Sequence, residues 1–172
     1  MQPLSGLVLT RLADNVSTDD ITSAKYVTSL EPADLAGICL KDLDPEFPAR
    51  MAGGGFLVAG RNFGCGSSRE WAPVALKAAG TRAVLAEGFA RLFYRNALNT
   101  GLPLVECPGI AQAAAIGDEL AIDLATGTVH NRTRELVLQG CPLPRFLLEI
   151  VEAGGLAEYL RRHGAAPAER RR

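Results

Sequence analysis

Residues 56–106 decide the fold, and they read FLVAGRNFGCGSSREWAPVALKAAGTRAVLAEGFARLFYRNALNTGLPLVE. Three short apolar runs in this stretch have the length and composition of buried strands. These runs are Phe56–Gly60, Ala83–Ala86 and Leu102–Glu106. The residues between them predict two helices, one from about Ser68 to Ala79 and one around Ala90–Asn99. A strand–helix–strand–helix–strand order is typical of parallel α/β units.

The sequence before residue 56 predicts one strand and a long irregular region. Leu7–Leu12 is apolar and β-branched enough to form a strand, and the polar run Asp14–Asp20 then predicts a loop. From Ile21 to Met51 prolines interrupt the pattern, with a short helix possible at Pro32–Leu35. We expect much of this region to stay mobile until a partner and a ligand arrive.

The sequence after residue 106 predicts antiparallel structure and a final helix. Alternating polar and apolar residues on both sides of Ala125–Gly127 indicate a hairpin, and Arg134–Gln139 predicts one more strand. Arg145–Arg162 predicts a terminal helix that Gly154–Gly155 interrupts. The whole chain is therefore predicted to be one compact mixed α/β domain, residues 1–172, with a C-terminal hairpin and helix over 118–163.

Composition and charge exclude several classes of protein. The 172 residues are 48% hydrophobic and 22% charged, and 18 Lys+Arg against 19 Asp+Glu give a net charge of −1. This balance predicts no general attraction to nucleic acid or to a membrane surface, and we expect Arg170–Arg172 to be a solvated end. No apolar run reaches about 18 residues, and no secretory signal is visible, so a cytoplasmic protein is expected.

The cysteines and histidines do not form a metal-binding pattern. Cys39, Cys65, Cys107 and Cys141 are widely spaced, with no C-x-x-C pair and no histidine at finger spacing. We therefore predict no metal site within this chain. We expect Cys39, Cys107 and Cys141 to be reduced, buried thiols.

The segment Gly64–Cys65–Gly66–Ser67–Ser68–Arg69–Glu70 is the most informative in the chain. Its two glycines allow a sharp turn and close approach to a ligand. Its hydroxyls and Arg69 stand at the predicted helix start, where unpaired N–H groups favour an anion. Arg69 can hold a carboxylate through two hydrogen bonds, and Glu70 is expected in the first helical turn, pairing with Arg69 or a nearby base. The pattern indicates a site for carboxylates or phosphates.

Structural explanations remain open for the same residues. A Gly–Ser–Ser stretch between strand and helix is often only a turn followed by a cap from Ser67 or Ser68. A phosphate-binding P-loop, a dinucleotide-binding glycine pattern and a Gly-x-Ser-x-Gly hydrolase motif are all absent. The polar residues Asn62, Arg91, Arg95, Asn96 and Asn99 extend the candidate site, or else form a solvated helix face.

A longer set of segments resembles the swivel domain of the aconitase family. The matching segments are Gly60–Glu70, Ala78–Gly80, Glu87–Arg91, Phe93–Asn96 and Asn99–Pro103, together with Asp14–Asp19 and Leu43–Pro48 upstream. The resemblance spans about residues 8–106. Within the family it is closest to the separate small subunits of enzymes that interconvert 2- and 3-isopropylmalate in leucine biosynthesis.

This resemblance implies a fold, a partner and a cofactor. The expected fold is an α/β swivel domain of three-layer β/β/α type with a mixed sheet. The expected partner is a large subunit whose cysteines hold a [4Fe–4S] cluster, with one open iron acting as a Lewis acid on the departing hydroxyl. The expected substrate is a small di- or tricarboxylate that is dehydrated and rehydrated.

The resemblance also implies roles for individual residues. Ser67 matches the catalytic base, which would take a proton from the carbon beside a carboxylate. Ser68 and Arg69 match residues that bind the substrate carboxylate, and Asp19 matches an acidic residue of the site. Thr28 falls in the segment, about residues 22–51, that sets specificity. Four residues, Asn62, Gly64, Cys65 and Gly66, are expected to support the loop together with Glu70.

Departures from the family pattern bear on the substrate. Trp71 stands where a histidine is usual, Ser17 replaces an aspartate and Ser23 replaces a proline. Homoaconitases place a basic residue near Thr28, so its neutral side chain favours a substrate with an apolar substituent, although Lys25 is close in sequence. The alternatives are a related hydro-lyase acting on homocitrate, dimethylmalate or citramalate, and a carboxylate-binding module without catalysis.

Overall fold

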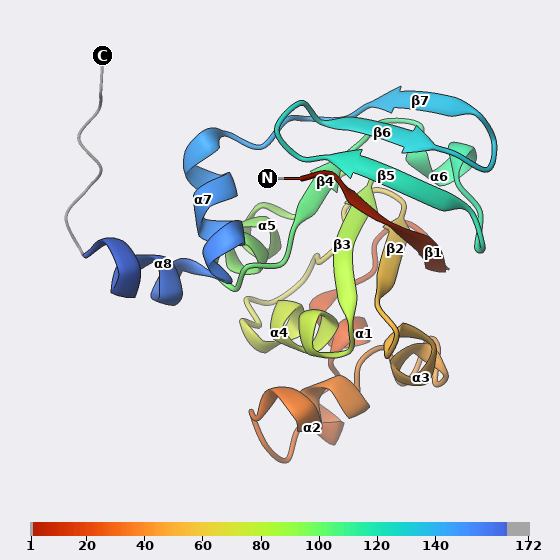
Figure 1. The fold of residues 1–172 in the computed structure, drawn as a ribbon. Helices are drawn as coiled ribbons and strands as arrows, with labels where there is room; N and C mark the ends of the chain where they lie inside the picture. The colour runs from red at the N-terminus through yellow and green to blue at the C-terminus, as the bar shows by residue number, and fades with distance from the viewer. Residues whose placement is uncertain (1, 165–172) are drawn as a thin grey trace.

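The structure is a computed structural model that describes residues 2–164 (Figure 1). The predicted solvated tail Arg170–Arg172 lies outside these residues. The strands are β1 (Leu4–Leu12), β2 (Gly55–Ala59), β3 (Thr81–Ala86), β4 (Leu104–Glu106), β5 (Glu119–Asp123), β6 (Thr128–Asn131) and β7 (Leu136–Gln139). The helices are α1 (Thr18–Ile21), the 3₁₀ helix η1 (Ala24–Tyr26), α2 (Pro32–Gly37), α3 (Phe47–Met51), α4 (Trp71–Ala78), α5 (Arg91–Asn99), α6 (Ile110–Ala113), α7 (Arg145–Ala153) and α8 (Leu156–His163).

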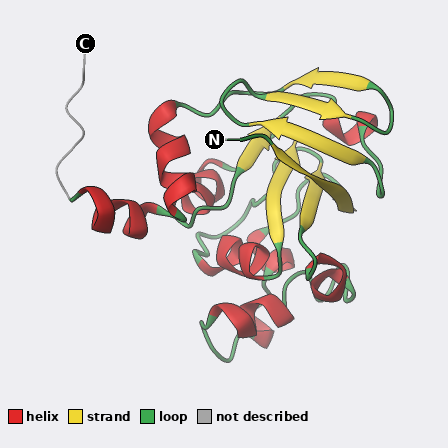
Figure 2. Cartoon of the chain, in the orientation of Figure 1, coloured by secondary structure: helices red, strands yellow, loops and turns green. Residues whose placement is uncertain are grey.

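All seven strands form one mixed sheet in the order β4-β3-β2-β1-β5-β6-β7. Strands β4, β3, β2 and β1 run parallel, and β1, β5, β6 and β7 run antiparallel, so β1 joins the two halves. The predicted strand–helix–strand–helix–strand unit is confirmed as β2-α4-β3-α5-β4, and the predicted hairpin as β5–β6. Figures 1 and 2 show the antiparallel half above the parallel half, with α2, α3 and α4 below.

Alternating side chains of the parallel strands enter two separate cores. In β2, Leu57 and Ala59 pack into a core that they share with the helices α2, α3 and α4. The neighbouring residues Phe56 and Val58 pack into a second core with Leu120, Ile122 and Val129 of the antiparallel half. Successive side chains of a strand point to opposite faces of the sheet, so each parallel strand contributes to both cores. The helices cover one face, and the antiparallel half of the same sheet covers the other, which gives two β layers and one helical layer. The mixed α/β fold with β/β/α layering is confirmed.

The irregular region of residues 22–51 contains more structure than its sequence predicts. Besides the expected short helix, α2, it holds η1 and α3. Five of its apolar residues are fully buried or nearly so in the helix-covered core: Leu35, Cys39, Leu40, Phe47 and Met51. Two of the prolines that interrupt the pattern, Pro32 and Pro48, lie in the first turns of α2 and α3, where a missing N–H costs nothing, and Pro45 lies in the turn before α3.

Two predicted helix boundaries have different outcomes. The terminal helix is interrupted as expected, because Gly154 and Gly155 adopt φ values of +94° and +135° between α7 and α8. The start of α4 is wrong by about three residues, since the helix begins at Trp71 and not at Ser68. Glu70 is its N-cap residue, so no acid occupies the first turn and neither serine caps the helix.

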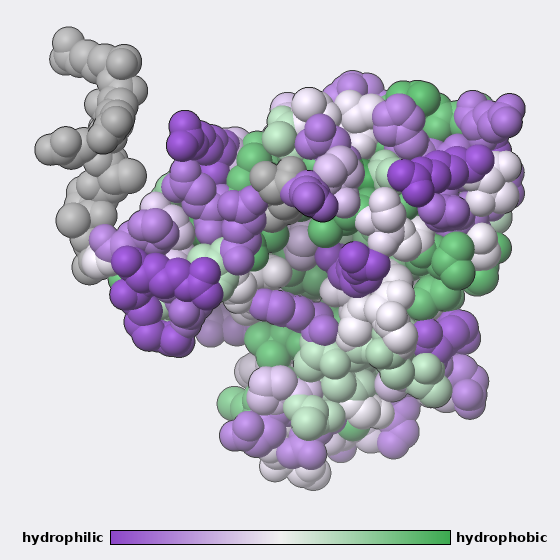
Figure 3. All heavy atoms as spheres, in the orientation of Figure 1, coloured by the Kyte–Doolittle hydropathy of each residue, from purple (hydrophilic) through white to green (hydrophobic). Residues whose placement is uncertain are grey.

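The surface of this fold is polar over its C-terminal helix. On the face shown in Figure 3, the most hydrophilic cluster lies over α8, on the left. Two arginines of α8, Arg161 and Arg162, both pair there with Glu158. Within residues 2–164, no helix is long and apolar enough to cross a membrane.

Candidate active site

The candidate site consists of two chain segments that lie against each other. We call Gly64–Glu70 the serine loop and Asp14–Thr22 the aspartate segment. Backbone hydrogen bonds join the two, from the Gly64 N–H to the Val16 carbonyl (2.7 Å) and from the Thr18 N–H to the Cys65 carbonyl (2.8 Å). The resemblance matches both segments to the site, and the structure brings them together from positions about 50 residues apart in sequence.

Glycine is required at the base of the serine loop. Gly64 has a φ of +78°, and a Cβ at this position would lie 2.1 Å from Cγ of Phe93. The preceding residue, Phe63, is fully buried with its ring edge-on to Phe89 and Phe93, at centroid distances of 6.2 and 5.3 Å. An aromatic cluster therefore anchors the loop, and only glycine passes close to it.

Ser67 is fixed by its backbone and free at its side chain. Its carbonyl accepts hydrogen bonds from Thr18 Oγ1 (2.8 Å) and from the Arg69 N–H (2.9 Å). Ser67 and Ser68 are exposed, and neither hydroxyl makes a hydrogen bond to another residue of the described chain. These contacts hold the loop backbone and leave two hydroxyls at the surface.

Arg69 is held by the aspartate segment. Its guanidinium pairs with the carboxylate of Asp19 and donates to the Thr22 carbonyl (3.0 Å). The Arg69 side chain is 19% exposed, whereas Asp19 is 58% exposed. The expected pairing of Glu70 with Arg69 is wrong, because Asp19 takes that role across the two segments and Glu70 is turned to the surface.

A capped helical turn shapes the aspartate segment. Ser17 Oγ accepts from the Asp20 N–H, and the Asp20 carboxylate accepts from the Ser17 N–H (2.8 Å), which forms a capping box at the start of α1. The sequence analysis predicted only a loop here. The serine–aspartate spacing of three residues is the signal that indicates such a cap.

The serine loop does not coincide with a helix N-terminus. The carbonyls of Cys65 and Ser67 accept hydrogen bonds from Thr18 of the aspartate segment, and the chain enters α4 only after Glu70. The expectation that a helix N-terminus would bind an anion at Ser67 and Ser68 is therefore wrong, because α4 begins after these residues. The backbone N–H groups of Gly66, Ser67 and Ser68 have no hydrogen-bond acceptor within residues 2–164, and they are the donors available in its place.

Two of the expected supporting residues tie the loop to Asn15. Asn62 adopts a φ of +56° and its Nδ2 donates to Asn15 Oδ1 (2.9 Å), while the Cys65 thiol lies 3.4 Å from the Asn15 carbonyl. Just upstream, the Asp14 carboxylate accepts from the Arg61 N–H (2.7 Å). A Cβ at Gly60 would collide with that carboxylate at 1.9 Å, a constraint that the sequence analysis missed.

The cysteines are free. Cys39 and Cys107 are buried, and Cys141 is exposed, so the expectation of burial is wrong for Cys141. Burial raises the pKa of the Cys39 thiol, and burial with the nearby Glu87 and Cys141 raises the pKa of Cys107 to about 11. Across residues 2–164, no group of three or more His, Cys, Asp and Glu side chains is placed to hold a metal ion. The four free cysteines within residues 2–164 therefore do not form a ligand set for an iron–sulfur cluster.

Thr28 does not line the grooves that Ser68 and Glu70 line. It lines a separate surface groove with Tyr26 and Asp34, and no hydrogen bond of the described chain joins it to Ser67 or Arg69. Lys25, the possible basic substitute, pairs with Asp42 (2.8 Å). The specificity role of Thr28 stays a prediction.

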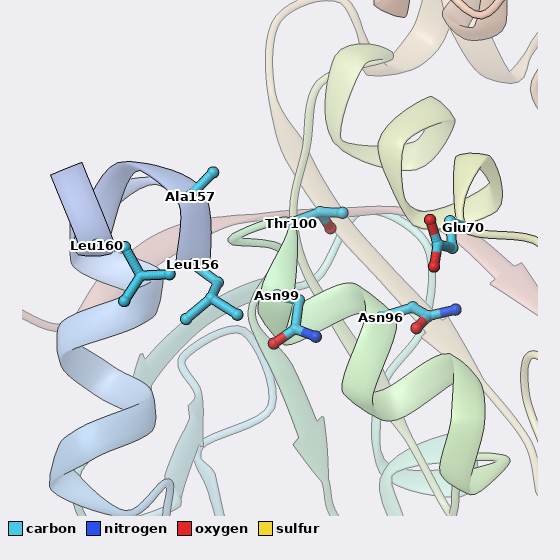
Figure 4. A pocket seen from close by; sticks show the side chains of 7 residues that line it. All are labelled: Glu70, Asn96, Asn99, Thr100, Leu156, Ala157 and Leu160. Carbon is cyan, nitrogen blue, oxygen red and sulfur yellow. The ribbon is translucent and has the colours of Figure 1, made fainter. Parts of the chain in front are cut away.

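The polar residues of α5 divide between two grooves. Asn96 and Asn99 line a groove with Glu70 and with three residues of α8, Leu156, Ala157 and Leu160 (Figure 4). Arg91 and Arg95 line another groove with Phe89, Tyr94 and Glu106. Only the first groove shares a residue, Glu70, with the serine loop.

Comparisons with known proteins place the chain in a family. Residues 11–108 match the model of the aconitase C-terminal domain, so the chain belongs to that family. It is 50% identical over 152 residues to the isopropylmalate/citramalate isomerase small subunit of Methanocaldococcus jannaschii, covering 88% of this chain and 90% of that protein. It is 49% identical over 148 residues to the 3-isopropylmalate dehydratase small subunit of Caldicellulosiruptor saccharolyticus, covering 86% of each. A crystal structure of a 3-isopropylmalate dehydratase from M. jannaschii superposes with a TM-score of 0.86 at 36% identity, covering 94% of this chain and 95% of that one.

Proposed function

We propose that this chain is the small subunit of a two-subunit hydro-lyase that interconverts 2- and 3-isopropylmalate in leucine biosynthesis. One observation carries the proposal: in a chain this similar to such small subunits, the Ser67 and Ser68 hydroxyls are exposed and unbonded on a loop whose backbone is held in place. Exposed hydroxyls on a fixed backbone have only water to release when a ligand binds.

In this proposal Ser67 is the general base. Its oxygen takes the proton from the substrate carbon beside a carboxylate, and the electron pair of the broken C–H bond forms the double bond as the hydroxyl departs. A serine anion needs stabilisation, because its ordinary pKa lies far above neutral. The unbonded N–H groups of Gly66, Ser67 and Ser68 and the positive charge of Arg69 supply it.

Arg69 and Ser68 bind the substrate carboxylate. Asp19 and the Thr22 carbonyl already orient the Arg69 guanidinium, so part of the cost of ordering this long side chain is met before substrate arrives. The exposed Asp19 is the partner that moves when a carboxylate binds, since its side chain has solvent on its other side.

The partner in this proposal is a large subunit that carries the [4Fe–4S] cluster. The cysteines of this chain do not fit a cluster, and Ser67 lies on an open surface that a second protein must cover to exclude water. An iron with an open position supplies Lewis-acid chemistry toward a substrate hydroxyl. A cytoplasmic location, and no binding of nucleic acid or membrane, stay predictions.

A second substrate is favoured by one specific comparison. The relative from M. jannaschii is named for both isopropylmalate and citramalate, and these acids differ only in the size of one alkyl group. Citramalate is therefore the first alternative substrate, ahead of homocitrate and dimethylmalate. A carboxylate-binding module without catalysis is the alternative from another class.

The test is reconstitution of this chain with the large subunit of its organism under anaerobic conditions. Ultraviolet absorbance of the unsaturated intermediate would be followed with isopropylmalate, citramalate, homocitrate and dimethylmalate. We expect turnover of isopropylmalate that needs both subunits. Turnover of homocitrate alone would make homocitrate, and not isopropylmalate, the substrate of this enzyme. An intact, cluster-loaded complex that turns over none of these acids would contradict the proposed hydro-lyase activity.

A further inference from the structure

The two outermost strands of the sheet meet where each of them ends. In the strand order, β4 and β7 stand at opposite edges. Just after these strands, the Cys141 N–H donates a hydrogen bond to the Glu106 carbonyl (2.8 Å). A Cβ at Gly140 would lie 3.2 Å from the Cβ of Cys107. The curled sheet therefore brings its own two edges together, and we call this contact the edge junction.

A cysteine lies on each side of the edge junction. Cys107 directly follows β4 and is fully buried, whereas Cys141 lies two residues beyond β7 and is exposed. The hydrogen bond of 2.8 Å reaches the carbonyl that precedes Cys107, so standard bond lengths place the two Cα atoms no more than about 7 Å apart. Disulfides join Cα atoms that are about 4.4–6.8 Å apart. The backbone thus holds the two residues at the separation of a disulfide.

The side chains of the two cysteines are close enough to interact. Burial raises the pKa of the Cys107 thiol to about 11, and negative charge on Glu87 and on Cys141 adds to this effect. Burial also raises the pKa of Tyr94, again with a contribution from Cys141. Because such interactions weaken with distance, the Cys141 sulfur lies near Cys107 and Tyr94.

We propose that Cys107 and Cys141 are a redox-active pair, which hydrogen peroxide or a related peroxide converts to a reversible disulfide that closes the sheet across its edge junction. The inference is independent of the proposed function. It assigns a modification site to two cysteines that lie outside the serine loop and the aspartate segment.

The oxidation has two steps. The Cys141 thiolate attacks one peroxide oxygen, the O–O bond breaks, and the sulfur becomes a sulfenic acid as hydroxide leaves. The Cys107 sulfur then attacks the Cys141 sulfur, the S–O bond breaks, and a second hydroxide leaves. The two hydroxides take up the protons of the two thiols as water. Two thiols are thereby oxidised to one disulfide, and one peroxide is reduced to two molecules of water.

Burial decides the order of the two cysteines in this reaction. Cys141 is exposed and meets a dissolved oxidant first. Cys107 is buried, and its raised pKa leaves little thiolate to react with peroxide directly. Its advantage is position, since a neighbouring sulfenic acid is held beside it at a high effective concentration. Cys107 therefore resolves the oxidised Cys141.

The test uses the full chain, reduced and then treated with one equivalent of hydrogen peroxide at neutral pH. Free thiols would be blocked and the chain digested with trypsin without reduction. Cleavage after Lys and Arg places Cys107 in the peptide 96–132 and Cys141 in the peptide 135–145. We expect these two peptides to be linked, at a mass about 2 Da below their sum, and to separate again with dithiothreitol.

Two variants and a stability measurement sharpen this test. Cys141→Ser, a change at the surface, should abolish the linked peptides, whereas Cys65→Ser, which removes a partly exposed thiol elsewhere, should leave them unchanged. Since α6, β5, β6 and β7 lie between the two cysteines, the disulfide constrains a long stretch of the unfolded chain. The thermal unfolding midpoint of the oxidised chain should therefore rise by about 5 °C or more, and that of oxidised Cys141→Ser should not.

Three results would overturn the inference. Peptide 135–145 recovered unlinked, with its cysteine oxidised to a sulfinic or sulfonic acid, would show that Cys107 does not resolve Cys141. Linkage that forms as fast in urea-unfolded chain would show that the fold does not pair the two thiols. A disulfide that leaves the thermal unfolding midpoint unchanged would contradict closure of the sheet.

Discussion

Two polar clusters stabilise loops of this fold, and they are built in opposite ways. Asp118, which is 5% exposed, accepts hydrogen bonds from Asn131 Nδ2 (2.8 Å), Arg134 Nε (2.6 Å) and the Ala115 N–H (2.9 Å). Around Ser67 the carbonyls of Cys65 and Ser67 accept hydrogen bonds that hold the loop, but the hydroxyls of Ser67 and Ser68 and the backbone N–H groups of residues 66–68 are unbonded within residues 2–164. A cluster whose groups are all bonded stabilises the fold, whereas one with free groups on a fixed frame is ready to bind a ligand.

The largest expected effect is a loss of activity, without a loss of stability, when a side chain of the Ser67 cluster is removed. In the reconstituted enzyme we expect Ser67→Ala to lower kcat by about 10²- to 10⁴-fold, the usual contribution of a general base. Its thermal unfolding midpoint should not change, because the Ser67 hydroxyl bonds to no residue of the described chain. Ser5→Ala on β1 is the control. A variant that keeps most of its activity would remove Ser67 from the mechanism.

The frame of the serine loop should be sensitive to a single methyl group. Gly64→Ala must adopt a φ of +78° and displace the Phe93 ring, so we expect a loss of about 3 kcal/mol or more in the free energy of unfolding. Gly37→Ala is the control, since a Cβ there meets nothing within 4 Å and the residue ends α2. Denaturant titration measures both; equal stability of the two variants would contradict the anchored loop.

Arg69 tests whether the loop recognises a carboxylate by shape as well as by charge. Arg69→Lys keeps the positive charge but loses the planar fork, and we expect kcat/KM to fall by about 10- to 100-fold, as for a lost charged hydrogen bond. Arg132→Lys, in an exposed pair with Glu119, is the control and should have no effect. Full activity of Arg69→Lys would mean that only the charge is used.

The Asp118 cluster should respond to pH and not to substrate. Burial alone would raise the pKa of Asp118, but hydrogen bonds from Asn131, Ala115 and Arg134 outweigh it and hold the pKa below the ordinary value. The stabilisation is therefore fully present above the unfolded pKa of about 3.9 and is lost as the pH falls through the folded pKa.

Asp118→Asn should thus cost about 1.5–3 kcal/mol of unfolding free energy at pH 7, and this difference should shrink below about pH 4. Asp34→Asn, at an exposed position on α2, should cost little at any pH. A cost for Asp118→Asn that stays constant down to pH 2 would show that the carboxylate charge is not what matters.

The sequence predicts the fold well where local signals agree with tertiary contacts. The β2-α4-β3-α5-β4 unit follows from short apolar runs between helix patterns, and the break at Gly154 follows from two glycines. The start of α4 is mispredicted because Thr18, far away in sequence, bonds residues 65 and 67 in an extended loop. Propensity cannot show such a long-range pairing.

For the candidate site, too, the sequence predicts some features and misses others. Ser67, Ser68 and Arg69 are found from the resemblance, and their position beside Asp19 follows from it as well. What local sequence could not show is which groups are already bonded: that Arg69 pairs with Asp19 and not with Glu70, and that Thr28 lines a separate groove. Those facts depend on the direction of side chains after folding.

The most direct test of the central claim is proton exchange on the substrate. The reconstituted enzyme would be incubated with isopropylmalate in deuterium oxide, and deuterium at the carbon that loses its proton would be measured by mass spectrometry. If Ser67 takes that proton, the wild-type complex exchanges it and the Ser67→Ala complex, equally assembled, does not. Exchange by the variant at the wild-type rate would mean that another group is the base, and the free hydroxyl of the serine loop would lose its proposed role.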